Sequence, residues 1–510
     1  MIAVLDFGSQ YTHLITRRIR ELGVKAEIFK HDIDERALKE NTIEGVILSG
    51  GPASVFEKNA PKINKKILKI GIPILGVCYG HQLLAYLLGG KLKSSKRREY
   101  GEEFIEIKRE GVLFAGLTKK EQVWFSHGIA VYKLPEGFKV LATTKNAPIA
   151  AFGNLDKNIF GVQFHPEVAH TPKGTKILKN FLFKICHAKK TWKIEDFKKK
   201  LIKDLKSEIG DKKVMIGVSG GVDSTVAAKL LYKAIKGNLY CVFIDTGLLR
   251  KNEGDEVSDL FRKLGFKNFQ KVPAEDKFLS ALKGIVDPEE KRKIFTKVYF
   301  QVFIDTAKML EKKHRFEFLA QGTIYPDRVE SGKTSKTSSL IKSHHNLSVP
   351  QTLGLQIIEP LKDFYKDEVR ELGKSLRIPA QIVGRHPFPG PGLAIRILGE
   401  TTKDRVKILQ EADAIFIEEL RKFGYYDKIW QAFAALLPIK SVGVMGDERT
   451  YDFIVALRAV TSRDAMTADW ANLPNELLKK VSSRIINQVK GINRVVYDIS
   501  QKPPATIEYE

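Results

Sequence analysis

The sequence predicts an α/β protein made of two doubly wound α/β domains followed by a smaller α+β domain. Three observations lead to this prediction. The chain has 510 residues, which is too many for one hydrophobic core. Short apolar runs alternate with helical patterns through most of its length, and this alternation stops near residue 384. We therefore expect three domains, at residues 1–187, 188–384 and 385–510.

The first domain is predicted from four short apolar runs, each of which ends in glycine, proline or a polar turn. These runs are IAVLDF, GVILSGGP, IPILGVC and FGVQFHP. Continuous apolar runs of this length are typical of parallel strands that are buried on both faces. Helical stretches separate the runs, so we expect a sheet that is covered by helices.

The second and third domains differ in texture. A lysine-rich helical connector at 188–211 leads into VMIGVSGG, a helix, LYCVFIDTG and another helix. This is a βαβ series, which indicates a second doubly wound sheet. The segment HPFPGPG is then too rich in proline and glycine for a regular element. A helical pattern at 403–423 and the β-like runs SVGVMG, YDFIVALRAV and NRVVYDIS follow it, so we expect a small α+β domain.

Composition places the chain among globular proteins, with 43% hydrophobic and 28% charged residues. It has three cysteines, Cys78, Cys186 and Cys241, and so sparse and odd a set is typical of a reducing compartment rather than of a disulfide framework. The first residues do not resemble a signal peptide, and no run approaches the ~20 apolar residues of a membrane helix. We expect a cytoplasmic protein that does not associate with membranes.

The formal net charge of +25 leaves two interpretations open. It is compatible with nucleic-acid binding, for instance by a tRNA-modifying enzyme, or with a basic enzyme that acts on polyanionic small molecules. Lysine is spread through the chain, and the third domain also carries acidic residues such as Glu400, Asp404 and Glu411. This distribution favours the second interpretation, and we expect no nucleic-acid partner.

The first candidate site surrounds Cys78. This residue follows the strand-like IPIL and precedes the helix-like LLAYLL, with Gly76 and Gly80 two residues away on either side. Glycines at these positions permit a sharp strand-to-helix turn, and the positive end of the following helix favours a thiolate. The alternative interpretation is a buried structural cysteine.

A base and an anion-binding turn accompany this cysteine. His165 follows another strand-like run and has Glu167 two residues after it, so the histidine can accept the thiol proton while the carboxylate orients the ring. The turn SGGP at 49–52 offers backbone N–H groups. Together with the N–H of Tyr79, they can form an oxyanion hole.

In this order, GVCYGHQ, SGGP and FHPE resemble the class I glutamine amidotransferases. The resemblance implies that Cys78 attacks the side-chain amide of glutamine and that ammonia is released. It further implies that His165 is the general base and Glu167 the orienting acid. The residues implied for the oxyanion and for glutamine are Gly50, Gly51, Tyr79 and Gln82. The chain has Ile129 where such enzymes usually have an aspartate near the glutamine α-amino group, so we expect a weaker grip on glutamine.

The second candidate site is the loop SGGVDS at 219–224, between the strand VMIGV and the helix TVAAKLLYKAI. The glycines let backbone N–H groups face an anion, and the helix dipole adds to the field. Ser219 and Ser224 can donate to phosphate oxygens, and Asp223 can hold Mg²⁺. The pattern is neither a Walker A loop nor a dinucleotide-binding GxGxxG.

The SGGxDS pattern resembles the N-type ATP pyrophosphatases, which cleave ATP between the α and β phosphates. The resemblance implies ATP as a co-substrate, Mg²⁺ held by Asp223, and a lid rich in glycine and serine at 331–339. Asp327 is either a metal or phosphate-network residue or a helix cap. The residues implied for ATP binding are Ser219, Gly220, Gly221, Val222, Asp223, Ser224, Thr225, Asp245 and Lys342.

Three segments of the third domain distinguish the acceptor. HPFPGPGLAIR at 386–396, SVGVMGD at 441–447 and KPPATIE at 502–508 resemble the GMP synthases, and the resemblance extends over essentially the whole chain. It implies that ATP adenylates XMP, that ammonia from glutamine displaces AMP to give GMP, and that a homodimer forms through the third domain. The residues implied for XMP are Arg292, His386, Pro387, Gly390, Pro391, Gly392, Lys502, Thr506, Ile507 and Glu508.

Another acceptor is the main alternative, because NAD synthetases and asparagine synthetases also use SGGxDS loops. Their glutaminase domains belong to other folds, however, so the first domain argues against them. The route by which ammonia would reach the adenylate is not visible in the sequence.

Overall fold

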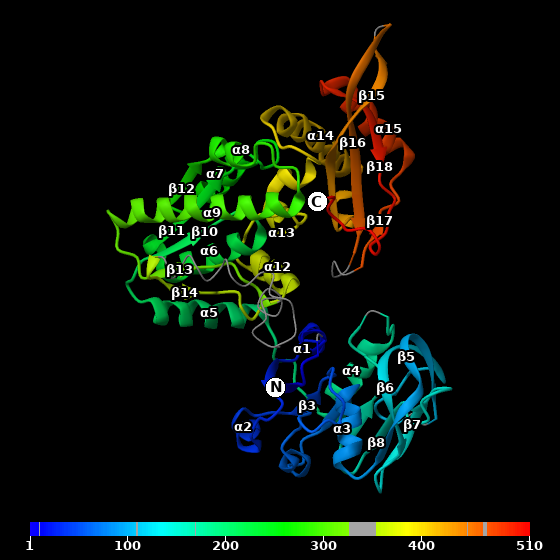
Figure 1. The fold of residues 1–510 in the computed structure, drawn as a ribbon. Helices are drawn as coiled ribbons and strands as arrows, with labels where there is room; N and C mark the ends of the chain where they lie inside the picture. The colour runs from blue at the N-terminus through cyan, green and yellow to red at the C-terminus, as the bar shows by residue number, and fades with distance from the viewer. Residues whose placement is uncertain (10, 109–110, 169, 326–352, 446, 463–466) are drawn as a thin grey trace. The chain divides into compact units, whose positions relative to one another are not determined.

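The computed structural model describes all residues except 10, 109–110, 169, 326–352, 446 and 463–466, and it leaves the side chains of 94–100 and 445 undescribed. The chain forms two compact units, Met1–Lys193 and Ile194–Glu510 (Figure 1). The predicted boundaries after residues 187 and 384 stay predictions. No described helix is long and apolar enough to cross a membrane.

The first unit is built on a nine-stranded sheet. Five parallel strands form one half, in the order β2 (Ala26–Lys30), β1 (Ile2–Asp6), β3 (Gly45–Leu48), β4 (Ile74–Val77) and β9 (Ile159–Val162). The antiparallel half continues through β8 (Ala151–Asn154), β7 (Lys139–Thr143), β5 (Lys91–Ile107) and β6 (Lys120–Lys133). When β9 is counted as the fifth parallel strand, this half has the strand order 2-1-3-4-5, which is that of a doubly wound fold.

Helices cover both faces of this parallel half, because successive residues of a strand point to opposite sides. Ile2 and Val4 of β1 pack in one apolar cluster with α1 (Thr12–Glu21), α4 (Gly174–Asn180) and the π-helical turn Phe181–Ile185. Ala3 and Leu5 pack in another cluster with α2 (Glu35–Glu40), α3 (Tyr79–Leu87) and the 3₁₀ helix Lys65–Lys69.

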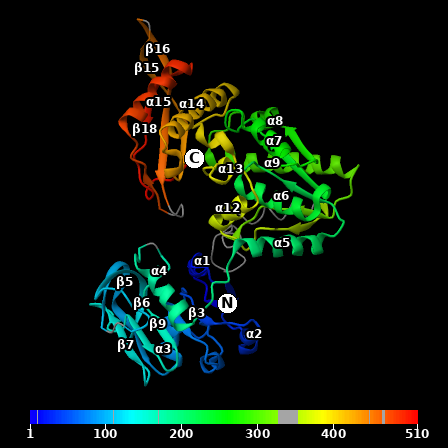
Figure 2. The same ribbon diagram turned by 180° about the vertical axis from the view of Figure 1, so that it is seen from behind.

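The second unit contains a five-stranded parallel sheet. Its strand order is β12 (Phe269–Pro273), β11 (Leu239–Asp245), β10 (Val214–Gly217), β13 (Phe318–Ala320) and β14 (Gln356–Ile358). Met215 and Val242 face α8 (Glu275–Ala281) and α9 (Pro288–Glu311), whereas Ile216 and Cys241 face the opposite layer of helices (Figure 2). That layer comprises α5 (Ile194–Ile209), α6 (Val222–Ile235), α7 (Glu253–Lys263) and α12 (Lys366–Ser375).

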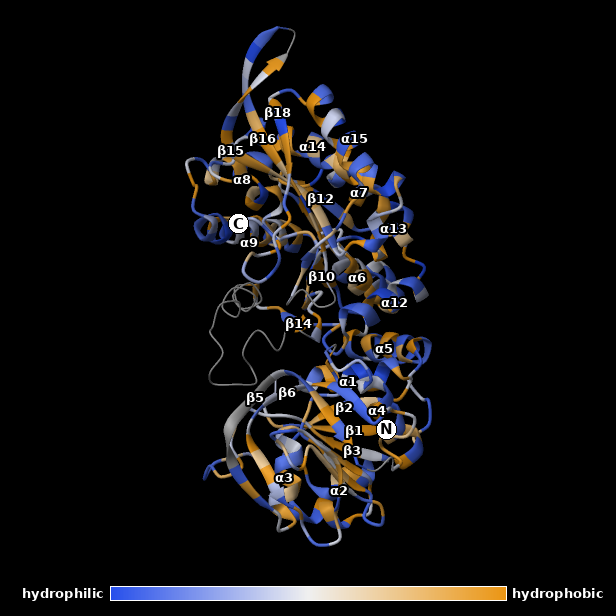
Figure 3. Ribbon diagram, turned by 90° about the vertical axis from the view of Figure 1, so that its right-hand side faces the viewer, coloured by the Kyte–Doolittle hydropathy of each residue, from blue (hydrophilic) through white to orange (hydrophobic). Residues whose placement is uncertain are grey.

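The helices of the second unit begin where the sequence provides start signals. Asp287 caps α9 by accepting the N–H of Glu290, and Pro288 occupies the first turn, where it has no hydrogen bond to lose. Hydrophilic and hydrophobic residues alternate along α5 (Figure 3). This pattern lets one side of the helix pack on α6 and α12 while the other faces solvent.

The last part of the second unit is a small α+β arrangement. The long antiparallel hairpin of β15 (Gln431–Met445) and β16 (Glu448–Thr461) is joined by β17 (Asp469–Trp470) and by β18 (Ile492–Tyr497), which runs parallel to β16. Helices α14 (Lys403–Lys422) and α15 (Asn475–Gln488) share one apolar cluster with this sheet and with α9. Short helical turns at Lys236–Asn238, Ala380–Val383, Gly392–Arg396 and Tyr426–Lys428 complete the unit. The predicted fold class is confirmed.

Candidate active sites

The cysteine site lies at the carboxyl ends of three neighbouring strands of the first sheet. Leu48 of β3 pairs with Gly76 of β4, and Val77 of β4 pairs with Val162 of β9. The segments that leave these strands carry Gly50, Cys78 and His165, so they start from one edge of the sheet. Ligands and reacting groups of parallel sheets gather at this edge.

Cys78 occupies a strained turn between β4 and α3. Its backbone has φ 52° and ψ −103°, a conformation that residues with a Cβ rarely adopt. The flanking glycines are required by close packing, because a Cβ on Gly76 would lie 2.5 Å from the carbonyl oxygen of Gly80, and a Cβ on Gly80 would lie 2.4 Å from that of Leu48. The turn therefore holds the thiol in one orientation at the start of the helix.

His165 and Glu167 form a buried pair. The ring Nδ1 of His165 lies 2.7 Å from Oε1 of Glu167, and the two side chains are 3% and 0% exposed. Burial opposes the charged imidazolium, but the charges of Glu167 and Cys78 and the hydrogen bonds to both raise the pKa of His165 well above its ordinary value. The raised pKa favours the protonated ring.

Residues that the sequence analysis did not single out hold this pair in place. The hydroxyl of Thr171 donates to the carbonyl oxygen of His165 at 2.7 Å, and Nε of Arg18 donates to that of Glu167 at 3.1 Å. The ring of Tyr11 packs edge-on against His165, with centroids 5.0 Å apart. No motif marks these positions, because they support the site through backbone contacts and packing.

The predicted oxyanion residues lie beside the thiol. A Cβ on Gly50 would lie 3.6 Å from the Cβ of Cys78 and 3.3 Å from Cε1 of His165, so this backbone borders both groups. A Cβ on Gly51 would lie 2.7 Å from the carbonyl oxygen of Phe7, which fixes the position of the turn. Tyr79 is the first residue of α3, and its hydroxyl donates to the carbonyl oxygen of Pro61.

The side chain of Gln82 is engaged within the protein. Its Nε2 donates to the carbonyl oxygen of Ile129 at 3.0 Å and to Oε1 of Gln163 at 3.3 Å. Nδ1 of His127 also lies 3.0 Å from the carbonyl oxygen of Ile129. The structure therefore places Gln82 as a support for the Ile129 segment. The neighbouring carbonyl oxygen of Ser126 accepts a hydrogen bond from Sγ of Cys78 at 3.5 Å.

The phosphate loop (219–224) lies between β10 and α6. Ser219 Oγ accepts the N–H of Gly221, and Ser224 Oγ accepts the N–H of Ser219. Gly220 has φ +73°, and a Cβ there would lie 2.3 Å from Cγ2 of Val257 on α7. The loop is thus a tight turn of backbone amides at a helix N-terminus, which is the arrangement that binds phosphate groups.

Neighbouring elements close in on this loop. Thr225 Oγ1 donates to the carbonyl oxygen of Gly221, and Val222 is buried in the core beneath it. Gly322 follows β13, and a Cβ at this position would lie 3.2 Å from the amide nitrogen of Ser224. Asp245 ends β11, where its carboxylate accepts the N–H of Gly247 and pairs with Lys271 at 3.0 Å. A cavity of about 400 Å³ opens beside Asp245.

Asp223 has one oxygen in use and one available. Its Oδ2 pairs with the ammonium group of Lys366, the first residue of α12. Its Oδ1 is buried and has no hydrogen-bond partner within the described part of the chain. A buried carboxylate oxygen without a partner beside a phosphate loop suits Mg²⁺, which takes one or two carboxylates and completes its shell with phosphate oxygens and water. The described residues contain no cluster of three side chains that would hold a metal alone.

Lys342, Asp327 and the segment 331–339 lie outside the described residues. Lys366 was not predicted. Its role as a partner of Asp223 depends on tertiary contact, which the sequence does not show.

The Pro- and Gly-rich segment packs against the loop that follows β11. Gly392 has φ +63°, and a Cβ there would lie 2.2 Å from the carbonyl oxygen of Leu248. The N–H of Leu393 donates to the same oxygen. Gly390 is exposed with open space around it, Pro387 is half-buried, and Pro391 is buried. This segment, residues 386–392, is rigid and lies beside the end of β11. It is called the ridge below.

The chain's last residues are tied to α9 and to the short helix Gly392–Arg396. The carboxylate of Glu508 accepts two hydrogen bonds from the buried Arg396, at 3.0 and 2.9 Å. Glu510 pairs with Lys291, whose side chain is 0% exposed, and Arg292 donates to the carbonyl oxygen of Glu510. The predicted residues Arg292, Gly392 and Glu508 thus come from three segments that the structure joins through these contacts.

The side chains of two other residues predicted for XMP contact other parts of the protein. Both ring nitrogens of His386 are engaged, with the N–H of Ala432 and with the carbonyl oxygen of Tyr426, and its ring stacks on that of Tyr426 at 3.8 Å. Ile507 is buried in an apolar cluster with Phe433. The described geometry leaves the ring of His386 no nitrogen for a ligand and makes the side chain of Ile507 part of the core.

The remaining predicted residues of the tail face solvent to different degrees. Lys502 is half-buried and pairs with Ala468 through backbone hydrogen bonds, while Thr506 is exposed and donates its hydroxyl to the carbonyl oxygen of Glu508. The carbonyl oxygen of Thr506 accepts from the buried Arg458. Arg458 was not predicted, because its sequence neighbours on β16 carry no motif.

Lys291 was also missed, yet a signal for it exists. Lys291, Phe295 and Val302 recur with helical spacing on one face of α9, and all three are buried. The neighbouring Arg292 was predicted instead. The period of the apolar positions would have shown which of the two cations points inward.

Comparison with known proteins finds three families that match different parts of the chain. The class-I glutamine amidotransferase family matches residues 3–185, the NAD synthase family matches 193–297, and the GMP synthase C-terminal domain matches 418–509. Three relatives are each named GMP synthase [glutamine-hydrolyzing]. They come from Thermosipho melanesiensis, Carboxydothermus hydrogenoformans and Clostridium kluyveri, at 54%, 53% and 52% identity.

Each of these alignments covers 100% of this chain and 99% of the relative. The NAD synthase match is confined to the segment with the phosphate loop, so it shows a shared nucleotide-binding architecture. The full-length relatives decide between the acceptors that the SGGxDS pattern left open. They confirm the resemblance to the GMP synthases. The prediction of an ATP-dependent ligase was based on this resemblance. The chain belongs to the glutamine-hydrolysing GMP synthase family.

Proposed function

We propose that this chain hydrolyses glutamine at Cys78 and uses the ammonia to convert XMP to GMP at the expense of ATP. One observation carries the proposal: a complete Cys–His–Glu arrangement and a phosphate loop backed by a GMP synthase-type C-terminal region occur in one chain. Each feature alone fits other enzymes, and only their combination requires both ammonia and an adenylated acceptor.

In the first half-reaction the thiolate of Cys78 attacks the side-chain carbon of glutamine. The resulting oxyanion is stabilised by backbone N–H groups near Gly50 and at Tyr79, which border the thiol. The raised pKa of His165 favours its protonated form, which can give its proton to the departing ammonia, and the neutral ring can then activate water for release of glutamate. Glu167 orients the ring and stabilises its charge.

In the second half-reaction the oxygen at C2 of XMP attacks the α-phosphorus of ATP, and pyrophosphate leaves. Ammonia then attacks C2 of the adenylated intermediate, and AMP leaves to give GMP. The amides of the phosphate loop (219–224) face the phosphates, and Ser219 and Ser224 supply hydroxyl groups. Asp223 would hold Mg²⁺, which would neutralise developing charge on the phosphates. Lys366 brings a fixed cation to the same loop. Lys342 remains a proposed phosphate ligand.

XMP is proposed to bind where the Pro- and Gly-rich ridge, α9 and the chain's last residues meet. Pro387 and Gly390 are the proposed rigid edge for the purine, and the buried Pro391 is proposed to support them. Arg292 and Lys502 are the proposed phosphate ligands, because guanidinium and ammonium groups match a phosphate dianion. His386 and Ile507 are proposed as supports of this site, since neither presents a free polar group.

A homodimer through the C-terminal region is supported by exposed apolar side chains on the hairpin of β15 and β16. Ile439, Val442, Val444 and Tyr451 are 61%, 53%, 73% and 58% exposed. A row of apolar residues in water is typical of a surface that another chain covers. We also propose a cytoplasmic location, because a free catalytic thiol works in a reducing compartment.

The proposal is tested by offering XMP, Mg-ATP and ammonia, and measuring AMP, pyrophosphate and GMP. We expect equal amounts of the three products and no turnover when deamido-NAD replaces XMP. Turnover with deamido-NAD and none with XMP would contradict the choice of acceptor. Stoichiometric binding of tRNA at moderate salt would instead support the nucleic-acid alternative.

A further inference from the structure

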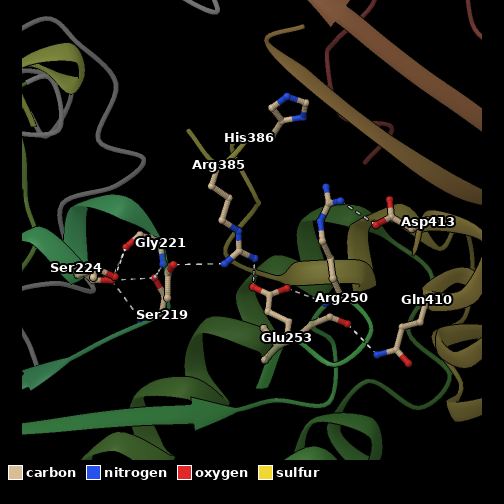
Figure 4. A network of polar contacts seen from close by, with 12 residues as sticks. Ser219, Gly221, Ser224, Arg250, Glu253, Arg385, His386, Gln410 and Asp413 are labelled. Atoms are coloured by element: carbon tan, nitrogen blue, oxygen red, sulfur yellow. Dashed lines mark hydrogen bonds and ion pairs between the residues drawn. The ribbon is translucent and has the colours of Figure 1, made fainter. Parts of the chain in front are cut away.

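The phosphate loop is held from outside by one arginine that precedes the Pro- and Gly-rich ridge. Nη1 of Arg385 donates to the carbonyl oxygen of Gly220 at 3.3 Å, and Nη2 pairs with the carboxylate of Glu253 (Figure 4). The side chains of Arg385 and Glu253 are 17% and 5% exposed. A guanidinium group that bridges a carbonyl oxygen and a buried carboxylate fixes the distance between the two segments that carry them.

Glu253 is fixed at the start of α7 by the rest of its contacts. Its second carboxylate oxygen accepts the N–H of Arg250 at 2.9 Å, and its own N–H donates to the carbonyl oxygen of Arg250 at 3.1 Å. The same helix contributes Val257, which packs against Gly220 so closely that a side chain there would not fit. Gly220 is therefore clamped by α7 on one side and by Arg385 on the other.

The backbone of Arg385 is in turn tied to the C-terminal part of the unit. The next residue, His386, stacks on Tyr426 and accepts the N–H of Ala432 from β15. The guanidinium group of Arg250 pairs with Asp413 of α14 at 2.9 Å and donates to the carbonyl oxygen of Ala432 at 3.2 Å. A displacement of the ridge relative to β15 would thus be felt at Arg385.

One more contact links Arg250 to the ridge. Its guanidinium carbon lies 5.4 Å from the ring centroid of Phe388, which belongs to the ridge. A cavity of about 680 Å³, lined by Arg385, Glu253, Asp413 and Tyr426 among others, opens on one side of these contacts. Arg385 lines this cavity, whereas Glu253 is also held by its hydrogen bonds with Arg250.

We propose that Arg385 and Glu253 are positioning residues that couple occupancy of the ridge by the acceptor nucleotide to the geometry of the phosphate loop. The inference rests on the proposed function, because it assumes that the ridge binds XMP and the loop binds ATP. The chain of contacts runs from the ridge through Arg385 to Gly220, with Glu253 holding the guanidinium group in place. Binding of XMP at the ridge sets Arg385, and Arg385 sets the amides that face the ATP phosphates.

The coupling is measured as the dependence of the KM for ATP on XMP concentration, with ammonia as the nitrogen donor and pyrophosphate release as the readout. In the unmodified enzyme we expect saturating XMP to lower the KM for ATP about tenfold, within the usual range for coupled sites. For Arg385→Met and Glu253→Gln we expect a KM for ATP that is raised and no longer responds to XMP. Arg385→Lys, which keeps the charge but loses the planar fork of the guanidinium group, should restore part of the response.

Arg262→Met is the matched control. Arg262 also lies on α7 and pairs with an acid, Asp259, but both side chains are exposed. We expect it to keep the unmodified response. Thermal unfolding of every variant separates a loss of stability from a loss of coupling, and Arg385→Lys decides the matter if Arg385→Met does not fold.

Two results would overturn the inference. One is a KM for ATP that does not depend on XMP in the unmodified enzyme. The other is an Arg385 or Glu253 variant with lower stability or kcat but an unchanged XMP response, because that is the behaviour of a purely structural ion pair. A failure of the proposed function has a different signature, since the unmodified enzyme would then release no pyrophosphate in response to XMP.

Discussion

The two candidate sites are built in opposite ways. At the cysteine site, three neighbouring strands deliver the nucleophile, the base and the oxyanion turn, and His165 and Glu167 are buried. At the phosphate loop the proposed ligands are mainly backbone amides, and Lys366 and Arg385 reach the loop from distant segments. Covalent chemistry requires one fixed side-chain geometry, whereas phosphate binding can be assembled from several segments.

The comparison teaches where each site is vulnerable. A change in the cysteine site should lower only the synthesis that uses glutamine as nitrogen donor, because the site is complete within one compact unit. A change in the phosphate loop should stop synthesis from either nitrogen donor. The following predictions test this asymmetry.

The largest effect is expected for Asp223→Ala. Loss of the carboxylate removes the proposed Mg²⁺ ligand and the partner of Lys366. We expect synthesis to fall by roughly 1000-fold with glutamine and with ammonia alike, since a metal ion contributes several kcal/mol to such steps. GMP formation from each donor is the measurement. A loss with glutamine alone would break the comparison, because it would place Asp223 in the glutaminase pathway.

Gly50→Ala is expected to lower glutaminase activity by roughly 100-fold, which is typical for loss of one oxyanion donor. The added Cβ would lie 3.3 Å from Cε1 of His165, so the turn must move away from the thiol. Synthesis from ammonia should stay unchanged. Gly237→Ala is a suitable control, because nothing lies within 4 Å of the added Cβ. Equal losses in the two variants would refute a specific role for Gly50.

Glu167→Gln should change the pH dependence of glutamine hydrolysis. Burial lowers the pKa of His165, and the carboxylate of Glu167 raises it. Removal of this carboxylate therefore lowers the pKa of His165. The protonated ring that accompanies the thiolate is lost as pH rises through the pKa of His165. The alkaline limb of the kcat/KM profile should therefore move to lower pH, with about tenfold less activity near neutrality. An alkaline limb that does not move would show that Glu167 acts only as a structural support.

The smallest effect is expected for Ile129→Asp. Ile129 is half-buried, and its carbonyl oxygen is held by Gln82 and His127, so the segment is already in place. A carboxylate there can pair with the α-ammonium group of glutamine, and we expect a several-fold lower KM for glutamine with little change in kcat. Ile129→Val serves as the control. A KM that does not fall would refute the prediction of weakened glutamine recognition.

The sequence predicts some parts of this molecule better than others. The parallel strands around Cys78 and the phosphate loop could be predicted, because buried strands leave apolar runs and tight turns leave glycines at fixed spacing. The nine-stranded extent of the first sheet could not, since β5 is a long, mostly polar strand that no continuous apolar run marks.

Candidate site residues follow the same division. Cys78, His165, Glu167 and the loop residues lie next to strand ends and form local motifs. Arg385, Glu253 and Lys366 act across more than 100 residues of sequence, at separations of 165, 132 and 143 positions. No local pattern encodes such a contact, so only the fold can show it.

The central claim is that the two reactions have separable sites in one chain. Cys78→Ala, assayed for GMP with glutamine and with ammonia in parallel, tests it most directly. The account predicts complete loss of glutamine-driven synthesis, because no other nucleophile attacks the amide, together with unchanged ammonia-driven synthesis. Loss of synthesis from both donors would contradict the account, as would persistence of glutamine-driven synthesis.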